Sequence, residues 1–135
     1  MTKLSSFNRN GANYFVRYNE TIRVKDGVLC DTYEFVDDDS QDLAIIYVDN
    51  GCSTPLQKVI GGTETVEGYM SGRAVLRIGL DDNKIVSYDF PNDNSSNEVT
   101  VLVGQTMQWE AIEDLTIYEI CTPTYKEGRF LDTTK

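Results

Sequence analysis

The feature that most constrains the fold is a succession of short segments with strand-like patterning, separated by Gly, Asn, Asp and Pro. From Arg73 to Leu80, apolar side chains occupy alternate positions and two arginines occupy positions between them. A period of two places the apolar side chains on one face of a strand, so this segment is predicted to be half buried. Asp81 to Lys84 then reads as a turn, and Ile85 to Phe90 as the returning strand of a hairpin.

The same reasoning marks further strands and two polar loops, which together predict an all-β sandwich or barrel. The strands are Tyr14 to Tyr18, Thr21 to Val24, Val28 to Phe35, Leu43 to Val48, Glu98 to Val103 and Leu115 to Cys121, and the loops are Val36 to Asp42 and Phe90 to Asn97. We expect residues 1–13 to form a loosely ordered N-terminal segment and residues 14–135 to form a single barrel domain.

Charge and hydropathy argue against several partners. The sequence has 12 basic and 22 acidic residues and a net charge of -10, which disfavours binding to nucleic acid and to anionic lipid. No segment approaches the ~20 apolar residues of a membrane span. The N-terminal residues lack the apolar stretch of a secretory signal. These observations predict a cytoplasmic protein without a nucleic acid or membrane partner.

The ionisable and sulfur-containing residues limit the available chemistry. Histidine is absent, so Ser-His, Cys-His and His-metal chemistry cannot operate. Cys30, Cys52 and Cys121 are widely spaced and are expected to be buried free thiols. A soft metal site that joins Cys52 and Cys121 to a glutamate is the weaker alternative. The predicted protein therefore has no cofactor and no metal.

Gly51 to Gly72 resembles the first motif of the cupin family. The family pattern runs from a glycine through a His-x-His pair and a glutamate to an aromatic residue and a closing glycine, and here Tyr69-Met70-Ser71-Gly72 matches its end. Gln57 and Val59 stand at the histidine positions and Thr65 stands at the glutamate position. The glycine frame of the motif is retained, whereas its metal ligands are replaced.

Two later segments also resemble cupins. Glu98 to Ala111 resembles the second motif, which places the last histidine of the family near Leu115, and Tyr118 to Phe130 resembles the exit segment of small bacterial cupins. The resemblance covers about Cys30 to Phe130. It implies an antiparallel, RmlC-like double-stranded β-helix, or jelly-roll barrel, that is a homodimer with a pocket at its open end. Gln57, Val59 and Leu115 do not suit a transition metal, so the implied barrel is metal-free.

Period two brings two groups of residues to the barrel-facing side of their strands. The first group is Thr65, Glu67 and Tyr69, and the second is Leu115, Ile117, Glu119 and Cys121. A carboxylate that faces an apolar interior has its pKa raised by desolvation, so Glu119 is a candidate proton donor or base. The alternative is a salt bridge from Glu119 to Arg73 or Arg77.

Aromatic residues supply candidate walls for the pocket. Trp109, Tyr69, Tyr47 and Tyr88 could stack on a sugar or a planar ring, or serve core packing and dimer contact instead. The predicted pocket residues are Gln57, Glu67, Tyr69, Trp109, Glu119 and Cys121.

The leading hypothesis for function is a non-catalytic binding protein that holds a small polar molecule or carbohydrate in the barrel. The first alternative is a metal-independent sugar isomerase, epimerase or lyase that uses glutamate and tyrosine. The second is a structural module whose edge strands form a dimer. No catalytic residue is assigned from the sequence.

Overall fold

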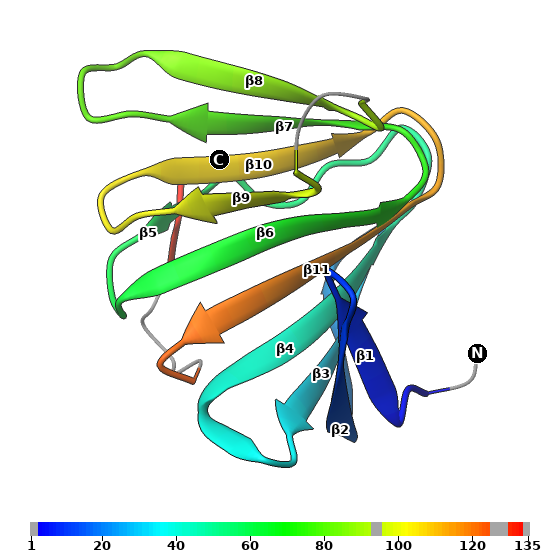
Figure 1. The fold of residues 1–135 in the computed structure, drawn as a ribbon. Coiled ribbons are helices and arrows are strands. Elements are labelled where there is room, and N and C mark those ends of the chain that lie inside the picture. The colour runs from blue at the N-terminus through cyan, green and yellow to red at the C-terminus, as the bar shows by residue number, and fades with distance from the viewer. Residues whose placement is uncertain (1–2, 93–95, 125–129, 134–135) are drawn as a thin grey trace.

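A computed structural model gives the fold of residues 3–92, 96–124 and 130–133, whose regular elements are all β-strands (Figure 1). The strands are β1 (Ser6–Arg9), β2 (Ala12–Lys25), β3 (Val28–Phe35), β4 (Asp38–Val48), β5 (Gln57–Val59), β6 (Glu64–Ser71), β7 (Ala74–Gly79), β8 (Ile85–Phe90), β9 (Glu98–Val101), β10 (Thr106–Ala111), β11 (Leu115–Thr122) and β12 (Phe130–Asp132). Within these residues, no helix has the length and hydropathy required to cross a membrane.

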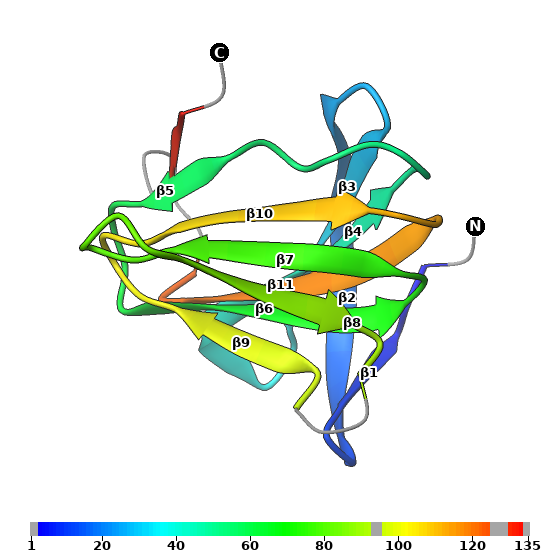
Figure 2. The same cartoon turned by 90° about the horizontal axis from the view of Figure 1, so that it is seen from above.

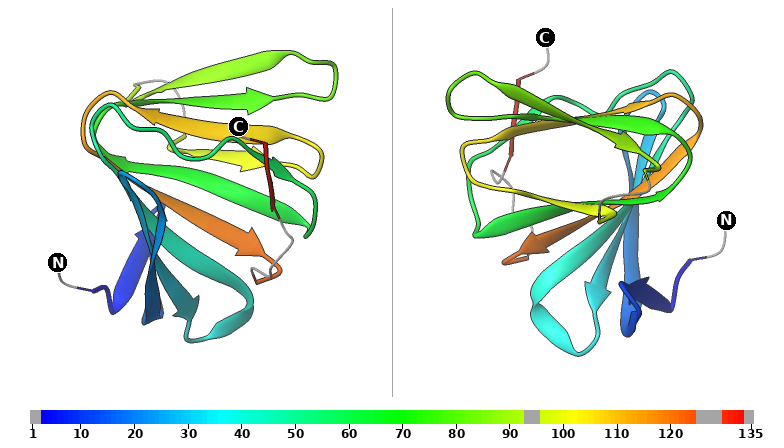
Figure 3. Two further views of the ribbon diagram at one scale, coloured as in Figure 1. Left: turned by 180° about the vertical axis from the view of Figure 1, so that it is seen from behind. Right: turned by 45° about the horizontal axis from the view of Figure 1, so that its top comes forward.

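The strands form two antiparallel sheets. The seven-stranded sheet has the order β1-β2-β3-β4-β11-β6-β9, and the five-stranded sheet has the order β12-β5-β10-β7-β8. From β4 to β11 the chain passes repeatedly from one sheet to the other, so the two layers enclose a common interior (Figures 2 and 3). This arrangement is an antiparallel jelly roll of the cupin type, which confirms the predicted fold class.

The hairpin predicted around the turn at residues 81–84 is confirmed. β7 pairs with β8 in a continuous register from Ala74 opposite Phe90 to Gly79 opposite Ile85. Leu76 and Ile78 are buried on the inner face, whereas Arg77 points outward and pairs with Glu110. The alternation in sequence therefore corresponds to the inner and outer faces of this sheet.

The main core lies between the two sheets. It contains Val28, Val48, Val59, Ala74, Leu76, Ile78, Phe90, Val101, Met107, Trp109, Ala111, Leu115 and Ile117. Trp109 from β10 and Ile117 from β11 are both almost fully buried, and they approach the interior from opposite sheets. Such burial of large apolar side chains supplies most of the free energy that stabilises a barrel of this size.

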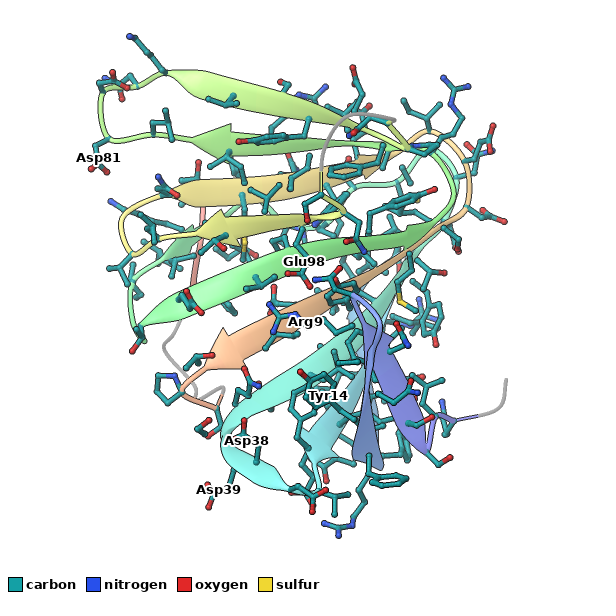
Figure 4. All side chains as sticks on the ribbon, viewed as in Figure 1. Arg9, Tyr14, Asp38, Asp39, Asp81 and Glu98 are labelled. Atoms are coloured by element: carbon teal, nitrogen blue, oxygen red, sulfur yellow. The ribbon has the colours of Figure 1, made fainter. Side chains whose placement is uncertain are left out.

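A second core lies on the outer face of the seven-stranded sheet. The hairpin of β1 and β2 folds back over that face, where Phe7 contacts Tyr118 edge to face with ring centroids 4.9 Å apart. Arg9 at the end of β1 reaches Glu98 at the start of β9, although these strands lie at opposite edges of the sheet (Figure 4). The hairpin therefore closes over the sheet as an additional layer.

The structure differs from several of the strand predictions. The predicted strands Tyr14–Tyr18 and Thr21–Val24 are parts of the single strand β2, because Asn19 forms a β-bulge and Glu20 pairs with Thr32, so the strand continues through both residues between them. The predicted loop at residues 36–42 is shorter than expected, since β4 already begins at Asp38. The expected domain boundary at residue 14 falls inside β2, and Phe7 before it is buried.

Candidate functional site

A cavity of about 580 Å³ opens between the two sheets, next to the hairpin of β2 and β3. Its volume lies within the range typical of small-molecule sites, roughly 300–1,000 Å³. The residues that line the cavity include Gln57, Glu67, Met107, Trp109, Glu119 and Cys121. They come from β5, β6, β10 and β11, so both sheets contribute to the wall.

Two glutamates stand next to each other on the wall formed by the seven-stranded sheet. Glu67 on β6 and Glu119 on β11 are direct cross-strand partners. Side chains in such positions point to the same face with Cβ atoms about 4.5–5.5 Å apart. The predicted inner faces of these two strands are therefore confirmed, and their register brings two carboxyl groups together inside the cavity.

Glu67 is the more deeply buried of the two, with 2% of its surface exposed. Its Oε1 accepts a hydrogen bond of 2.8 Å from Trp109 Nε1. Its Oε2 is buried and accepts no hydrogen bond from a donor among the described residues. Burial raises the pKa of Glu67 well above its ordinary value, the charge of Glu119 and a side-chain hydrogen bond to Glu119 raise it further, and the hydrogen bond from Trp109 opposes this shift. The Glu67 carboxyl group is thereby held in its neutral form above the pH at which an ordinary glutamate ionises.

Trp109 is fixed in place by its backbone and by its ring. Its backbone N–H donates to Thr54 Oγ1 at 2.9 Å, and its backbone oxygen accepts from the Thr54 N–H. The ring packs against Phe90 with centroids 5.5 Å apart, while the indole N–H points to Glu67. A buried indole N–H requires an acceptor, which explains why one oxygen of Glu67 faces the opposite sheet.

Glu119 is not held by the arginines that we considered as partners. Arg77 pairs with Glu110, and Arg73 pairs with Glu113, both on the outside of the five-stranded sheet. The Cys121 thiol lies 3.6 Å from Glu119 Oε1, and the carboxyl groups of Glu119 and Glu67 are joined by a side-chain hydrogen bond. The salt-bridge alternative for Glu119 is therefore wrong, and its carboxyl group faces the cavity.

The cysteines do not form the soft metal site. Cys121 lines the cavity beside Glu119, whereas Cys52 packs against Gly27 at the turn before β3. Cys30 from β3 also lines the cavity, although we did not predict it. Burial, followed by the charge of Glu119, raises the pKa of Cys30 to about 12. A thiol with this pKa is neutral at physiological pH and is a poor nucleophile.

The positions assigned to the cupin histidines do not converge on one point. Gln57 lines the cavity, Val59 is part of the buried core, and Leu115 lies on β11 in the opposite sheet. Met107 on β10, not Leu115, stands directly across from Gln57. Among the described residues, no group of three His, Cys, Asp or Glu side chains is arranged to hold a metal ion. The side chains present therefore do not fit a transition metal.

The candidate aromatic residues are not gathered in one wall. Trp109 lines the cavity. Tyr69 instead stacks on Phe90 at 5.4 Å, and its hydroxyl donates to the backbone oxygen of Gly72. Tyr47 packs on the outer core, and Tyr88 packs against the inner core. Of the aromatic residues proposed for the pocket, Trp109 is the one that the structure places there.

The other walls of the cavity include residues that the sequence analysis missed. They are Glu20, Ile22, Arg23 and Val24 on β2, Cys30 on β3, Asp42 and Ile46 on β4, and Phe130 on β12. The alternation of Glu20, Ile22 and Val24 was a usable signal, because these residues share a face of one strand. It was missed because the bulge at Asn19 divides the pattern into two short runs.

Comparison with known proteins identifies the fold and not the family. No protein-family model and no curated protein matches the sequence. Solved structures of Bacillus subtilis oxalate decarboxylase are similar, including one concerned with its Mn(II) centres, at 16% identity and a TM-score of 0.68. A second, determined at pH 4.6, has 17% identity and a TM-score of 0.67. These matches cover 85% of this chain and 30% of those chains, so this chain spans under a third of their length.

Proposed function

We propose that the protein is a non-catalytic binding protein that holds a small polar molecule or carbohydrate in the cavity between its sheets. The observation that carries this proposal is Oε2 of Glu67, which is buried at the wall of a cavity of about 580 Å³ and accepts no hydrogen bond from the described residues. A buried polar atom without a partner costs about 1–3 kcal/mol, and a ligand donor would remove that cost. Gln57 and Trp109 supply further polar and aromatic contacts on the opposite wall.

The charge of the cavity separates this protein from its structural neighbours. The similar solved proteins are named as oxalate decarboxylases. Oxalate is a dianion, and the cavity here presents the acidic side chains of Asp42 and Glu119 beside the neutral carboxyl group of Glu67. Like charges brought together in a partly desolvated site repel each other, so the cavity favours a neutral or cationic ligand. In this proposal, the shared fold therefore binds a different class of ligand here.

The test uses the intrinsic fluorescence of Trp109, which is the single tryptophan of the chain. Neutral monosaccharides, polyols, amino sugars and amines are titrated while Tm and Trp109 emission are recorded. A ligand in the cavity raises Tm and changes the emission, because the indole N–H is bonded to Glu67. Oxalate serves as the anionic comparison and is expected to produce neither effect.

Two variants localise the binding. Glu67→Gln is expected to lower the affinity for the ligand, whereas Glu110→Gln is expected to leave it unchanged. Glu110 is on the same strand as Trp109, faces outward and pairs with Arg77 at 2.8 Å, so it is a matched control outside the cavity. A ligand that raises Tm equally in all three proteins binds elsewhere and contradicts the proposal.

Acid–base catalysis is the second candidate function. It is favoured by one observation, the adjacent carboxyl groups of Glu67 and Glu119, of which Glu67 has a raised pKa. Such a pair can donate a proton from one carboxyl and accept one at the other. An isomerase or epimerase would transfer solvent deuterium into a sugar substrate. No deuterium incorporation across a panel of bound sugars would reject this candidate.

The homodimer implied by the family resemblance remains a proposal. Several large apolar side chains are exposed outside the cavity, including Phe15 on β2 and Ile85 on β8, each 68% exposed. Exposed apolar groups on strands near a sheet edge suit an interface between copies. Light scattering at micromolar concentration should give twice the chain mass of 15.2 kDa. A mass of one chain would reject the dimer.

A further inference from the structure

We propose that the ligand of the cavity is an organic cation whose ammonium group binds between Glu67 and Glu119. This inference rests on the proposed binding function and names its ligand class. The geometry behind it is the cross-strand pairing of two carboxyl groups on one wall, with one buried oxygen that accepts no hydrogen bond from a described donor.

The carboxyl groups of Glu67 and Glu119 suit a ligand that donates hydrogen bonds. Trp109 Nε1 already occupies Oε1 of Glu67, so Oε2 is the position left for a ligand. An ammonium group has three donors and accepts none. It can therefore contact Oε2 of Glu67 and the carboxyl group of Glu119 together. Hydrogen bonds between charged partners are roughly twice as strong as neutral ones, which favours an ammonium group over a hydroxyl group.

The charged side chains that line the cavity are mostly acidic, like the carboxyl pair itself. The titratable and charged groups that face the cavity are Glu20 and Arg23 on β2, Cys30 on β3, Asp42 on β4, Glu67 on β6, and Glu119 and Cys121 on β11. The lining residues of β5, β10 and β12 carry no charge. Arg23 is largely exposed and lies 3.8 Å from Asp26, outside the carboxyl pair. A cation therefore meets an excess of acidic groups, whereas an anion meets repulsion.

The remaining walls suit an apolar body attached to the ammonium group. Trp109 and Met107 come from β10, Ile46 comes from β4, and Phe130 comes from β12. Aromatic faces attract cations and also pack against hydrocarbon. The ligand class that satisfies both the walls and the carboxyl pair is an amine with a ring or chain of several carbons, or an amino sugar.

Binding of such a cation should be linked to the loss of a proton. Without ligand, burial holds the Glu67 carboxyl group neutral. When the ammonium group arrives already charged, it stabilises the ionised carboxylate, and the carboxyl proton passes to solvent. Affinity should therefore rise as the pH increases through the pKa of Glu67. It should fall again only when the amine itself deprotonates, near pH 10 for an alkylamine.

The experiment compares ligands of one shape and three charges. Cyclohexylmethylamine, cyclohexylmethanol and cyclohexanecarboxylate are titrated by calorimetry and by Trp109 fluorescence, together with glucosamine, glucose and glucuronate. At least one amine should bind about 10-fold or more tightly than its alcohol, which corresponds to about 1.4 kcal/mol, and the carboxylates should bind most weakly. Calorimetry in two buffers of different ionisation enthalpy should show release of up to one proton per amine.

Variants identify the carboxyl pair as the cause of this preference. Glu67→Gln should reduce amine affinity about 10-fold or more and leave the affinity for the matched alcohol within about threefold. Glu119→Gln should act in the same direction, and Glu110→Gln should change neither affinity. Circular dichroism and Tm confirm that each variant is folded before binding is measured.

The outcomes separate this inference from the binding function. If an alcohol or glucose binds as tightly as its amine, the cation inference is wrong while the cavity remains a binding site for neutral molecules. If neither amine binds at millimolar concentration, the inference is also wrong, and the neutral sugars and polyols then decide the binding function. Equal loss of amine and alcohol affinity in Glu67→Gln would assign Glu67 to cavity shape and not to charge recognition.

Discussion

Two glutamates on neighbouring strands of one sheet have opposite environments. Glu67 on β6 faces the inner cavity, where Trp109 donates to one oxygen and no described donor reaches the other. Glu98 on β9 faces the outer layer, where Arg9 contacts both of its oxygens (Figure 4). The Tyr118 hydroxyl donates to one of these oxygens. Burial raises the pKa of Glu67, whereas hydrogen bonds from Arg9 and Tyr118 lower the pKa of Glu98 despite its partial burial.

The difference lies in the charged partner of each glutamate: Glu98 has a basic partner, whereas Glu67 lies opposite a second acid. On the outer face, Glu98 and Arg9 join the two edges of the seven-stranded sheet and hold the β1–β2 hairpin in place. On the inner face, the carboxyl pair of Glu67 and Glu119 forms no ion pair with a basic side chain in the described part of the chain and opens into the cavity. The outer glutamate therefore contributes to stability, and the inner glutamate is retained at a cost to stability that binding would offset.

The largest expected effect on the free energy of unfolding comes from a substitution that crowds the Tyr118 ring on the outer face. Gly68 lies directly opposite Glu98 in the β6–β9 pairing, and the Tyr118 ring lies against Gly68. Gly68→Ala would place a methyl group within the Tyr118 ring and displace the hydroxyl that donates to Glu98. We expect a loss of about 2–3 kcal/mol in the free energy of unfolding, measured by urea denaturation.

A glycine in the other sheet provides the control. Gly79 is also in a strand, but the close neighbour of an added methyl group there is the Thr106 hydroxyl, at the end of a side chain that can rotate. Gly79→Ala is expected to change the free energy of unfolding by less than about 1 kcal/mol. Equal losses in both variants would indicate a general glycine effect and not the Tyr118 contact.

The next effect comes from breaking the outer ion pair. Arg9→Ala leaves Glu98, whose side chain is 13% exposed, without its cationic partner. We expect a loss of about 1–2 kcal/mol near neutral pH. Because the folded pKa of Glu98 is lowered, its contribution is present above the unfolded pKa and is lost as the pH falls through the folded pKa. The defect of Arg9→Ala should accordingly shrink in acid.

An exposed ion pair tests whether burial matters for Arg9. Arg17 and Glu34 lie 2.5 Å apart, but both side chains are about 60% exposed or more. Arg17→Ala should cost less than about 0.5 kcal/mol, because exposed ion pairs contribute little. If Arg17→Ala and Arg9→Ala destabilise the protein equally, the outer layer is not held by the Arg9–Glu98 pair.

Apart from the control variants, the smallest effect on stability is expected at the inner glutamate, and it has the opposite sign. The raised pKa of Glu67 means that its contribution is present below the unfolded pKa, about 4.3, and is lost as the pH rises through the folded pKa. Glu67→Gln removes this dependence and should stabilise the protein by about 1 kcal/mol at neutral pH, with little change at pH 4. A loss of stability at neutral pH would show that the ionised carboxylate is favourable there.

The strand pattern predicted most of the fold, because period two is a local property. Leu76 and Ile78 face inward as their alternation indicated, and Glu67 and Glu119 lie on the faces that the same rule assigned to them. The order and spacing of motifs also led to the cupin-type jelly roll, despite the changed residues at the histidine positions.

The partners of the site residues could not be predicted, because they depend on the pairing of strands that are distant in sequence. Period two does not reveal that Glu67 and Glu119 are cross-strand neighbours, or that Trp109 reaches Glu67 from the other sheet. Leu115 was misplaced because counting residues from a motif does not determine which sheet a residue enters. Tyr69 was placed on the correct face, but its stacking on Phe90 is a tertiary contact.

The most direct test of the account is a titration of the glutamate side chains themselves. Carbon-13 NMR of the side-chain carboxyl groups, assigned with Glu67→Gln and Glu98→Gln, follows each ionisation separately in the folded protein. We expect the pKa of Glu67 to lie above the ordinary glutamate value of about 4.3 and the pKa of Glu98 to lie below it. An ionisation of Glu67 at or below that of Glu98 would contradict the contrast between the inner and outer faces.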